Sequence, residues 1–198
     1  MNKPDQIAVI KAPADEIERL RSELRVARAK ITELEARADI DPLLDILNRR
    51  GFERELARSI AYVKRYGTDA VLIYLDLDGF KSVNDRCGHS AGDELLKAVT
   101  AALTSKVRAS DVVARLGGDE FAILMWNVSE SHAFAKARDL ENAVAAVEIE
   151  RGGVKCAVGA SAGIVAVSPL DTPAQAIDAA DRAMYVRKRE RYSDQTTQ

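Results

Sequence analysis

The sequence predicts an α+β protein in which helices flank a mixed, mainly antiparallel central sheet, with a coiled-coil helix preceding this domain. Three observations carry the prediction. Apolar segments of strand length alternate with amphipathic segments, two apolar runs meet at a Gly-Gly hairpin, and a heptad pattern occupies the N-terminal part. We expect an N-terminal segment over 1–38 with a helix at about 16–38, a globular domain over 39–191, and a tail over 192–198.

The N-terminal helix is predicted by apolar residues that recur at alternating spacings of three and four. The first core position of the heptad holds Ile17, Leu24, Ile31 and Ala38, and the second holds Leu20, Ala27 and Leu34. A helix packed on the domain would carry a similar stripe. The flanking charges favour a parallel homodimer, because each pair across such a seam is of opposite sign. These pairs are Glu16 with Arg21, Glu23 with Arg28, and Lys30 with Glu35.

The first half of the globular domain reads as helix, strand, helix. An amphipathic helix over 51–67 is stopped by Gly67. The run AVLIYLD, from Ala70 to Asp76, is almost wholly apolar, which indicates a strand buried on both faces. A turn and a short helix follow within 79–92, and a longer helix covers about 93–104.

The second half begins with the hairpin VVARL-GG-DE-FAIL, whose glycines permit a tight turn. A helix over about 131–147 follows, with Ser129 or Ser131 as its N-cap. The segment 154–167 has strand character, and its glycine and alanine residues indicate close packing. The last helix covers 171–189, with Pro173 near its first turn.

Composition narrows the class of protein. Of the 198 residues, 47% are hydrophobic and 30% charged, which suits a soluble globular chain, and the net charge of -2 argues against nucleic acid as a partner. No apolar run approaches the roughly 18 residues that span a membrane. The first residues have too short an apolar core for a secretion signal, so we expect a cytoplasmic protein. Cys87 and Cys156 match no metal or redox spacing, and we expect both to be reduced and packed.

Asp76 is the first polar residue after the buried strand, so its carboxylate is expected to emerge at the edge of the sheet. Taken alone, it reads as a helix cap or a turn aspartate. However, Gly79 permits a tight turn directly after it. The backbone N–H groups of Gly79, Phe80 and Lys81 suit a phosphate, and the Lys81 ammonium adds a positive charge.

The hairpin turn places two further carboxylates, Asp119 and Glu120, after Gly117 and Gly118. An ordinary acidic, solvated turn is one interpretation. If the hairpin strands flank the buried strand, Asp119 lies near Asp76, and two carboxylates beside a phosphate cradle suit Mg²⁺ or Mn²⁺ in phosphoryl transfer. The bare glycines then let a substrate approach the backbone. These residues predict a metal-assisted nucleotidyl-transfer site.

Five segments of the globular domain carry a resemblance to one known family. They are RLGGDEF (115–121), DLDGFKSVNDRCGHSAGD (76–93), DPLLDILNRRGF (41–52), SAGIV (161–165) and ADRAMYVRK (180–188). Over about 39–191, in this order and spacing, the chain resembles the GGDEF family, the diguanylate cyclases. The resemblance implies a fold related to the class III nucleotide cyclases and the polymerase palm. It also implies that two GTP molecules condense to cyclic di-GMP with release of two pyrophosphates.

The resemblance implies a role for each matching residue. Asp76, the backbone carbonyl of Leu77 and Asp119 would hold the metals, two Mg²⁺ or Mn²⁺ ions in each half-site. Asp119 would also help to deprotonate the attacking 3′-hydroxyl, with Glu120 in a supporting catalytic or metal role. Asn84 and Asp93 would bind guanine, since a carboxylate accepts from the N1–H and the amine that distinguish guanine from adenine. The phosphates would lie at Gly79, Phe80, Lys81 and Lys188, and GTP would lie against Gly117 and Gly118.

One domain of this kind supplies half of a site, so two must face each other, and the coiled coil would raise the effective concentration of the second half-site. Arg108 and Asp111 precede the hairpin turn in the sequence RASD. Taken alone, they form a weak pattern for a turn ion pair. At this offset they match the family's product-inhibition motif, in which an arginine suits a guanine edge or a phosphate of cyclic di-GMP.

Three departures from the family pattern stand out. Leu44 and Asp45 replace the usual Thr-Gly, which we expect to alter the link to the coiled coil and to leave the chemistry intact. Tyr192 stands near the position of a second phosphate-binding arginine, and Arg189 and Arg191 are the candidate substitutes for it. No receiver or ligand-sensing pattern precedes the heptads, so we expect either an excised output module or control by product, expression or a partner.

The main alternative function is a degenerate domain that binds cyclic di-GMP or GTP as a receptor. Such members typically lose signature carboxylates or phosphate-binding residues, whereas this chain keeps them. A coiled-coil adaptor with an inert domain would leave these polar groups unexplained. We therefore favour the enzyme.

Overall fold

The computed structural model describes residues 16–28, 30 and 38–196. The chain divides into two compact units, Met1–Ala38 and Asp39–Gln198, which we treat separately. In the first unit, residues 16–28 are helical, and Ile17, Leu20 and Leu24 are each about half exposed in the single chain. Ile31, Leu34 and Glu35 of the expected seam lie outside the described residues. The coiled coil therefore stays a prediction.

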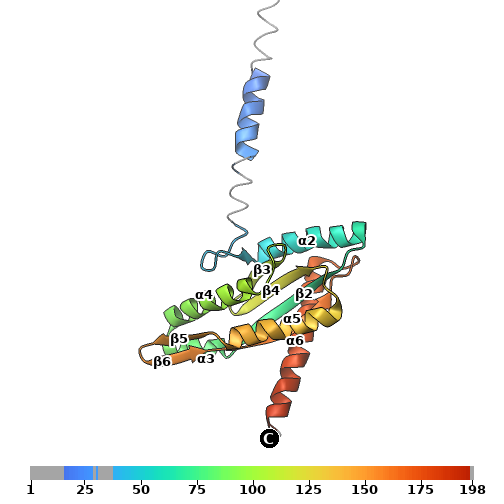
Figure 1. The fold of residues 1–198 in the computed structure, drawn as a ribbon. Helices are drawn as coiled ribbons and strands as arrows, with labels where there is room; N and C mark the ends of the chain where they lie inside the picture. The colour runs from blue at the N-terminus through green and yellow to red at the C-terminus, as the bar shows by residue number, and fades with distance from the viewer. Residues whose placement is uncertain (1–15, 29, 31–37, 197–198) are drawn as a thin grey trace, which may run out of the picture. The chain divides into compact units, whose positions relative to one another are not determined.

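The second unit contains strands β1 to β7 and helices α2 to α6, most of which are labelled in Figure 1. In chain order they are β1 (Leu47–Asn48), α2 (Arg49–Tyr66), β2 (Ala70–Asp78), α3 (Phe80–Cys87), α4 (His89–Ser105), β3 (Val112–Gly117), β4 (Glu120–Trp126), α5 (Glu130–Ala145), β5 (Glu148–Arg151), β6 (Val154–Ala157), β7 (Gly159–Ala166) and α6 (Pro173–Thr196).

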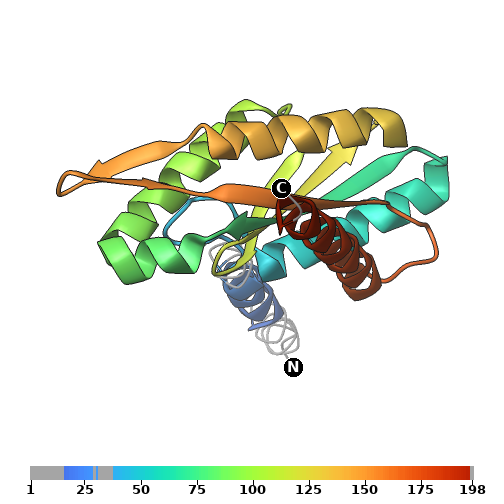
Figure 2. The same ribbon diagram turned by 90° about the horizontal axis from the view of Figure 1, so that it is seen from below.

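The central sheet has the strand order β1-β3-β4-β2-β7. The pair β1 and β3 is parallel, and the other neighbours are antiparallel. The predicted mixed, mainly antiparallel sheet flanked by helices is therefore confirmed. A separate hairpin of β5 and β6 lies at one end of the domain, beside α3 and α4 (Figure 2).

Strand β2 lies inside the sheet and is covered on both faces, as its apolar run predicts. Val71, Ile73 and Leu75 pack with α3, α4 and α5, whereas Leu72 and Tyr74 pack with α2 and α6. Figures 1 and 2 show the corresponding layers of helices on the two sides of the sheet. Because side chains alternate along a strand, Asp76 shares the face of Tyr74, on the side of α2 and α6.

Two glycines have definite structural purposes. Gly67 ends α2 in the left-handed conformation, at φ 65°, and its N–H donates to the Val63 carbonyl, as predicted. Gly163 of β7 lies directly beneath α6, where a Cβ atom would overlap the backbone of Ala180 and Met184. The close packing predicted for this strand is therefore a contact between the backbones of β7 and α6.

Several elements differ from the sequence prediction. The structure adds the short strand β1 and the strand β5, and α4 begins at His89, earlier than the expected 93. Helix α6 continues to Thr196, past the expected domain end at 191. The prediction that both cysteines are reduced is wrong, because a disulfide joins Cys87 at the end of α3 to Cys156 of β6. Their separation of 69 residues gives no local signal of this pairing. Within the described residues, no helix combines the length and apolar character required to cross a bilayer.

Candidate active site

The end of β2 and the turn before β4 bring Asp76 and Asp119, the two predicted metal-binding carboxylates, to the same edge of the sheet. Asp76 of β2 pairs in register with Glu120 of β4. The Leu77 N–H donates to the Asp119 carbonyl over 3.1 Å, so the hairpin turn lies directly beside the end of β2. Asp76, Leu77, Asp119 and Glu120 therefore occupy one edge of the sheet.

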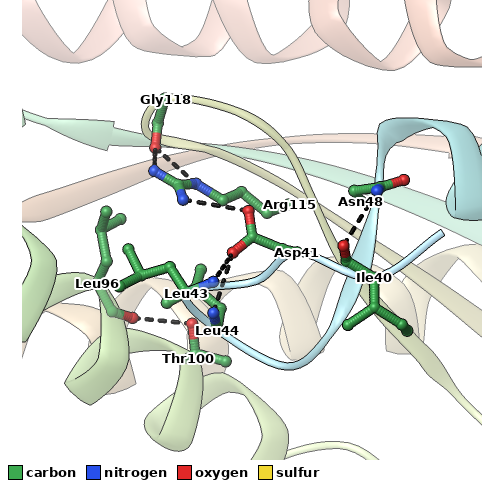
Figure 3. A network of polar contacts seen from close by, with 9 residues as sticks. All are labelled: Ile40, Asp41, Leu43, Leu44, Asn48, Leu96, Thr100, Arg115 and Gly118. Carbon is green, nitrogen blue, oxygen red and sulfur yellow. Dashed lines mark hydrogen bonds and ion pairs between the residues drawn. The ribbon is translucent and has the colours of Figure 1, made fainter. Parts of the chain in front are cut away.

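The turn between β3 and β4 is held by Arg115. Its guanidinium donates to the Gly118 carbonyl from Nε over 3.0 Å and from Nη2 over 2.7 Å, and Nη1 reaches Asp41 Oδ2 over 3.2 Å. Figure 3 shows this arginine between the turn and the segment that enters the domain. Asp41 Oδ1 also accepts from the N–H groups of Leu43 and Leu44. One aspartate thus holds both the entry loop and the arginine that binds the turn before Asp119.

The departure from Thr-Gly lies in this entry loop. Leu44 is buried, and Asp45 has a positive φ of 55°, a conformation that favours glycine. Asp45 therefore adopts the backbone shape that the family's usual glycine would take most easily. The substitution changes the local conformational energy and adds no group to the site.

Lys188 of α6 forms ion pairs with both carboxylates at the end of β2. Its Nζ contacts Asp76 Oδ1 and lies 2.9 Å from Asp78 Oδ1, while the Ser161 hydroxyl donates to Asp78 Oδ2 over 2.8 Å. Burial raises the pKa of Asp76, and Lys188 only partly opposes that rise. Burial also disfavours the Lys188 ammonium, but its hydrogen bonds to Asp76 and Asp78 outweigh this and raise the pKa of Lys188. The last helix therefore reaches the edge where a phosphate cradle is expected.

Glu120 is surrounded by groups that the sequence reasoning did not assign. The hydroxyl of buried Tyr74 hydrogen-bonds to Glu120, and burial together with this bond raises the pKa of Tyr74. Arg49 Nη2 lies 3.6 Å from Glu120 Oε2, and Arg49 Nε donates to the Leu116 carbonyl. Asp181 of α6 is also close, since burial and the charge of Glu120 raise its pKa.

Two of these missed residues have a signal in the sequence. Tyr74 is two residues before Asp76, so both side chains lie on one face of β2. Asp181 is about two helical turns before Lys188, which places both on one side of α6. Arg49 has no comparable signal, because its contacts come from the packing of α2 against the hairpin.

The predicted phosphate cradle lies at the turn into α3. Gly79 is the N-cap of this helix, with φ 83°, a conformation in which a Cβ would be strained. Phe80 is buried, whereas Lys81 is exposed in the first turn. The first turn of a helix leaves N–H groups without intrahelical partners, as the predicted phosphate contact requires.

Asn84 of α3 presents an unpaired acceptor toward the start of α4. Its Oδ1 is buried and has no hydrogen-bond partner among the described residues. Gly92 lies against it, and a Cβ there would overlap Oδ1. Asp93, the next residue of α4, is exposed. The two predicted guanine ligands thus lie near each other, one with a buried side-chain oxygen and the other exposed to solvent.

The oxygen donors at the strand ends fit a hard divalent cation. The described residues contain no group of three or more His, Cys, Asp or Glu side chains arranged as metal ligands. Mg²⁺ is commonly held by one or two carboxylates together with substrate phosphates. Asp76, the Leu77 carbonyl and Asp119 therefore fit a cation that shares its ligands with a nucleotide.

Arg108 and Asp111 lie at a separate cavity of about 350 Å³. Asp111 Oδ2 accepts from the Arg108 backbone N–H over 2.9 Å, and Oδ1 accepts from the Trp126 N–H over 3.4 Å. The aspartate therefore shapes the turn through backbone contacts. The cavity is lined by Lys106, Arg108, Asp111, Met125, Asn127, Val128, His132 and Lys136, a set rich in basic groups.

The possible substitutes for the missing arginine lie near the end of α6. Arg189 is exposed, and the side chains from Arg191 onward are outside the described part of the chain. The neighbouring Arg187 donates to the Ala162 carbonyl over 2.7 Å and lies 3.7 Å from Glu141 Oε1. It therefore ties α6 to β7 and α5. The replacement of the phosphate-binding arginine stays a prediction.

Comparison with known proteins identifies relatives along most of the chain. Residues 38–193 match the family described as "Diguanylate cyclase, GGDEF domain". The curated diguanylate cyclase DosC of Escherichia coli K12 is 35% identical over 151 residues, which are 76% of this chain and 33% of DosC. The chain thus spans about a third of the length of that relative.

Two solved structures from Caulobacter crescentus have a similar fold. The GGDEF domain of DgcB in complex with c-di-GMP is 29% identical, with a TM-score of 0.73, and the match covers 77% of this chain and 91% of that one. The coiled coil and GGDEF domain of DgcB, also with c-di-GMP, is 28% identical, with a TM-score of 0.72. That match covers 93% of this chain and 95% of the other.

Proposed function

The chain belongs to the GGDEF-domain family of diguanylate cyclases, and on this premise we propose that it condenses two GTP molecules into cyclic di-GMP with release of two pyrophosphates. The observation that carries the proposal is the meeting of Asp76 and Asp119 at one sheet edge, with Lys188 beside them. Receptor members typically lose signature carboxylates at this edge, and here Asp76, Asp119 and Glu120 are all present.

Each 3′-hydroxyl attacks the α-phosphate of the other GTP, so one P–O bond forms and the bond to pyrophosphate breaks. Asp76, the Leu77 carbonyl and Asp119 would hold the metals, two Mg²⁺ or Mn²⁺ ions in each half-site. When bound, these ions stabilise the developing negative charge and lower the pKa of the attacking hydroxyl. Asp119 accepts the hydroxyl proton, and the hydrogen bond from Tyr74 and the nearby Arg49 hold Glu120 in its supporting position beside it.

Substrate binding divides between the two ends of α3. The N–H groups of Gly79, Phe80 and Lys81 and the ammonium of Lys81 hold the phosphates, with Lys188 reaching them from α6. Asn84 and Asp93 accept from the guanine edge, which supplies a partner for the buried Asn84 oxygen. The positive φ of Gly118 and the bare Gly117 leave the turn open to GTP.

The reaction requires two domains facing each other, and we assign their association to the N-terminal helix. The half-exposed Ile17, Leu20 and Leu24 support this, because a single helix would leave them in water. The DgcB structure with its coiled coil supports it as well. Cyclic di-GMP, the product, binds at Arg108 and Asp111, where the basic lining of the cavity suits its phosphates, and it inhibits the enzyme.

The test is incubation of the purified protein with GTP and Mg²⁺, with cyclic di-GMP quantified by chromatography. We expect product, and we expect the rate per molecule of protein to fall on dilution as the dimer dissociates. Absence of product at all protein concentrations, with GTP still bound, would favour the receptor alternative.

A further inference from the structure

Lys188 lies between the two carboxylates that end β2. Its Nζ contacts Asp76 Oδ1 and is 2.9 Å from Asp78 Oδ1. The side chain of Lys188 is 26% exposed, and those of Asp76 and Asp78 are 20% and 18% exposed. One ammonium thus serves two carboxylates in a region that is largely shielded from water, where charge interactions are stronger than at the surface.

The backbone beneath Lys188 is fixed, whereas its side chain is long and flexible. Gly163 brings the α6 backbone into direct contact with β7, and Arg187 donates to the Ala162 carbonyl. The Ser161 hydroxyl holds Asp78 Oδ2 independently of the lysine. Movement of the Lys188 ammonium therefore requires only rotation of its four-carbon stem.

The same carboxylate is required by two different cations. Asp76 is a proposed metal ligand, and its Oδ1 is already in contact with the Lys188 ammonium. A divalent ion at this oxygen and an ammonium beside it repel each other, so the two compete. Nucleotide phosphates offer the ammonium another anionic partner within the same site.

We propose that Lys188 occupies Asp76 as an internal cation until nucleotide arrives, and that the triphosphate then draws it away and opens Asp76 to the metal. This inference rests on the proposed function, because it needs a nucleotide triphosphate at this edge of the sheet. Metal and nucleotide then bind cooperatively, and each raises the affinity for the other by the same factor.

The first experiment is a titration with Mn²⁺ alone, without nucleotide, in which free Mn²⁺ is measured by electron paramagnetic resonance. We expect Lys188→Met to bind Mn²⁺ about tenfold more tightly than the wild type, since a neighbouring charge shifts a carboxylate equilibrium by at least this much. Lys81→Met is the matched control, because it removes the same charge from an exposed side chain. Equal Mn²⁺ affinity in wild type and Lys188→Met, or an equal gain in Lys81→Met, overturns the inference.

A second experiment uses only the wild type and is independent of how the variants fold. Crystals are soaked at a Mn²⁺ concentration near the wild-type dissociation constant measured with 3′-deoxy-GTP, which lacks the attacking hydroxyl. Without nucleotide, Lys188 should remain on Asp76, and with 3′-deoxy-GTP it should lie on a phosphate with Mn²⁺ at Asp76. Mn²⁺ at Asp76 in nucleotide-free crystals overturns the inference. Neither experiment needs turnover, so a failure to form cyclic di-GMP remains a separate result.

Discussion

Asp41 and Arg115, which are 74 residues apart in the sequence, form an ion pair of 3.2 Å in which both side chains are mostly buried. The same guanidinium holds the Gly118 carbonyl (Figure 3). The segment that leads from the N-terminal unit into the domain is therefore bonded to the turn that carries Asp119. A change in the entry segment reaches the proposed catalytic turn through one arginine.

Asp41→Asn should keep the hydrogen bonds of this residue to the entry loop and remove its ion pair with Arg115. The amide oxygen still accepts from Leu43 and Leu44, but the amide group loses the charge that pairs with Arg115. We expect a loss of about 1–3 kcal/mol in the free energy of unfolding and a lower rate of cyclic di-GMP formation. Urea denaturation and the turnover assay check this. Glu55→Gln, at the exposed pair with Arg58, is the control and should cost no more than about 0.5 kcal/mol.

Asp119→Ala should abolish turnover while the fold survives. Loss of the proposed proton acceptor and metal ligand should reduce the rate by about a thousandfold or more. Stability should not fall, because the charge of Asp119 raises the pKa of Asp76 and its removal relieves that repulsion. Asp178→Ala, at an exposed carboxylate of α6, is the matched control. Retained turnover in Asp119→Ala would refute its assigned role.

Tyr74→Phe should change how stability depends on alkaline pH. The pKa of Tyr74 in the folded state is raised above its ordinary value of 10.0 by burial and by the bond to Glu120. Above pH 10 the unfolded chain releases this proton and the folded chain keeps it, so wild-type stability falls by up to about 1.4 kcal/mol per pH unit from this group. The variant lacks this contribution, so its stability should fall less steeply above pH 10.

Urea unfolding from pH 7 to pH 11 measures the effect of Tyr74→Phe. Below about pH 9 the free energies of unfolding of the two proteins should change with pH in parallel. They should differ by the cost of the lost hydrogen bond, about 1 kcal/mol. Curves that stay parallel up to pH 11 would show that Tyr74 does not retain its proton.

Arg108→Ala should weaken product inhibition. The arginine lines the cavity and offers a guanidinium to phosphate or guanine, so its loss should raise the inhibition constant of cyclic di-GMP at least about tenfold. Initial rates at increasing added product measure this, with Arg58→Ala of α2 as the exposed-arginine control. If the wild type shows no inhibition to relieve, the assignment of this cavity fails.

Asp45→Gly should stabilise the protein. Asp45 has φ 55°, which costs an L-residue about 1 kcal/mol, and glycine adopts it without a Cβ clash. Glycine also raises the conformational entropy of the unfolded chain, which offsets part of this effect. We therefore expect a net gain of about 0.5 kcal/mol in the free energy of unfolding. Urea denaturation measures it, and Asp45→Ala, which keeps a Cβ, should show no gain. A less stable Asp45→Gly would mean that the aspartate side chain itself stabilises the loop.

The sequence was sufficient to predict the sheet class and the meeting of Asp76 with Asp119. The apolar run before Asp76 and the Gly-Gly turn before Asp119 are local patterns, and antiparallel pairing then brings their ends together. Lys188 also carried a local signal, because ADRAMYVRK is a helical segment with a matching motif.

The contacts around Glu120 and Arg115 were beyond such reasoning. Arg49 meets Glu120, and Asp41 meets Arg115, through side chains from distant segments whose approach depends on tertiary packing. β1 contains only two residues, too few to show any periodicity. The spacing of Cys87 and Cys156 gives no signal of their disulfide, because it joins α3 to the β5-β6 hairpin, which the sequence pattern does not predict.

The backbone contact between Gly163 and α6 has a consequence for mutational tolerance. Position 163 admits no side chain, because Ala180 and Met184 already fill the space where a Cβ would lie. A replacement there would lift the helix that carries Asp181 and Lys188 away from the sheet. Substitutions should therefore be tolerated on the outer face of α6 and almost excluded at Gly163. This glycine constrains the site although it has no reactive group of its own.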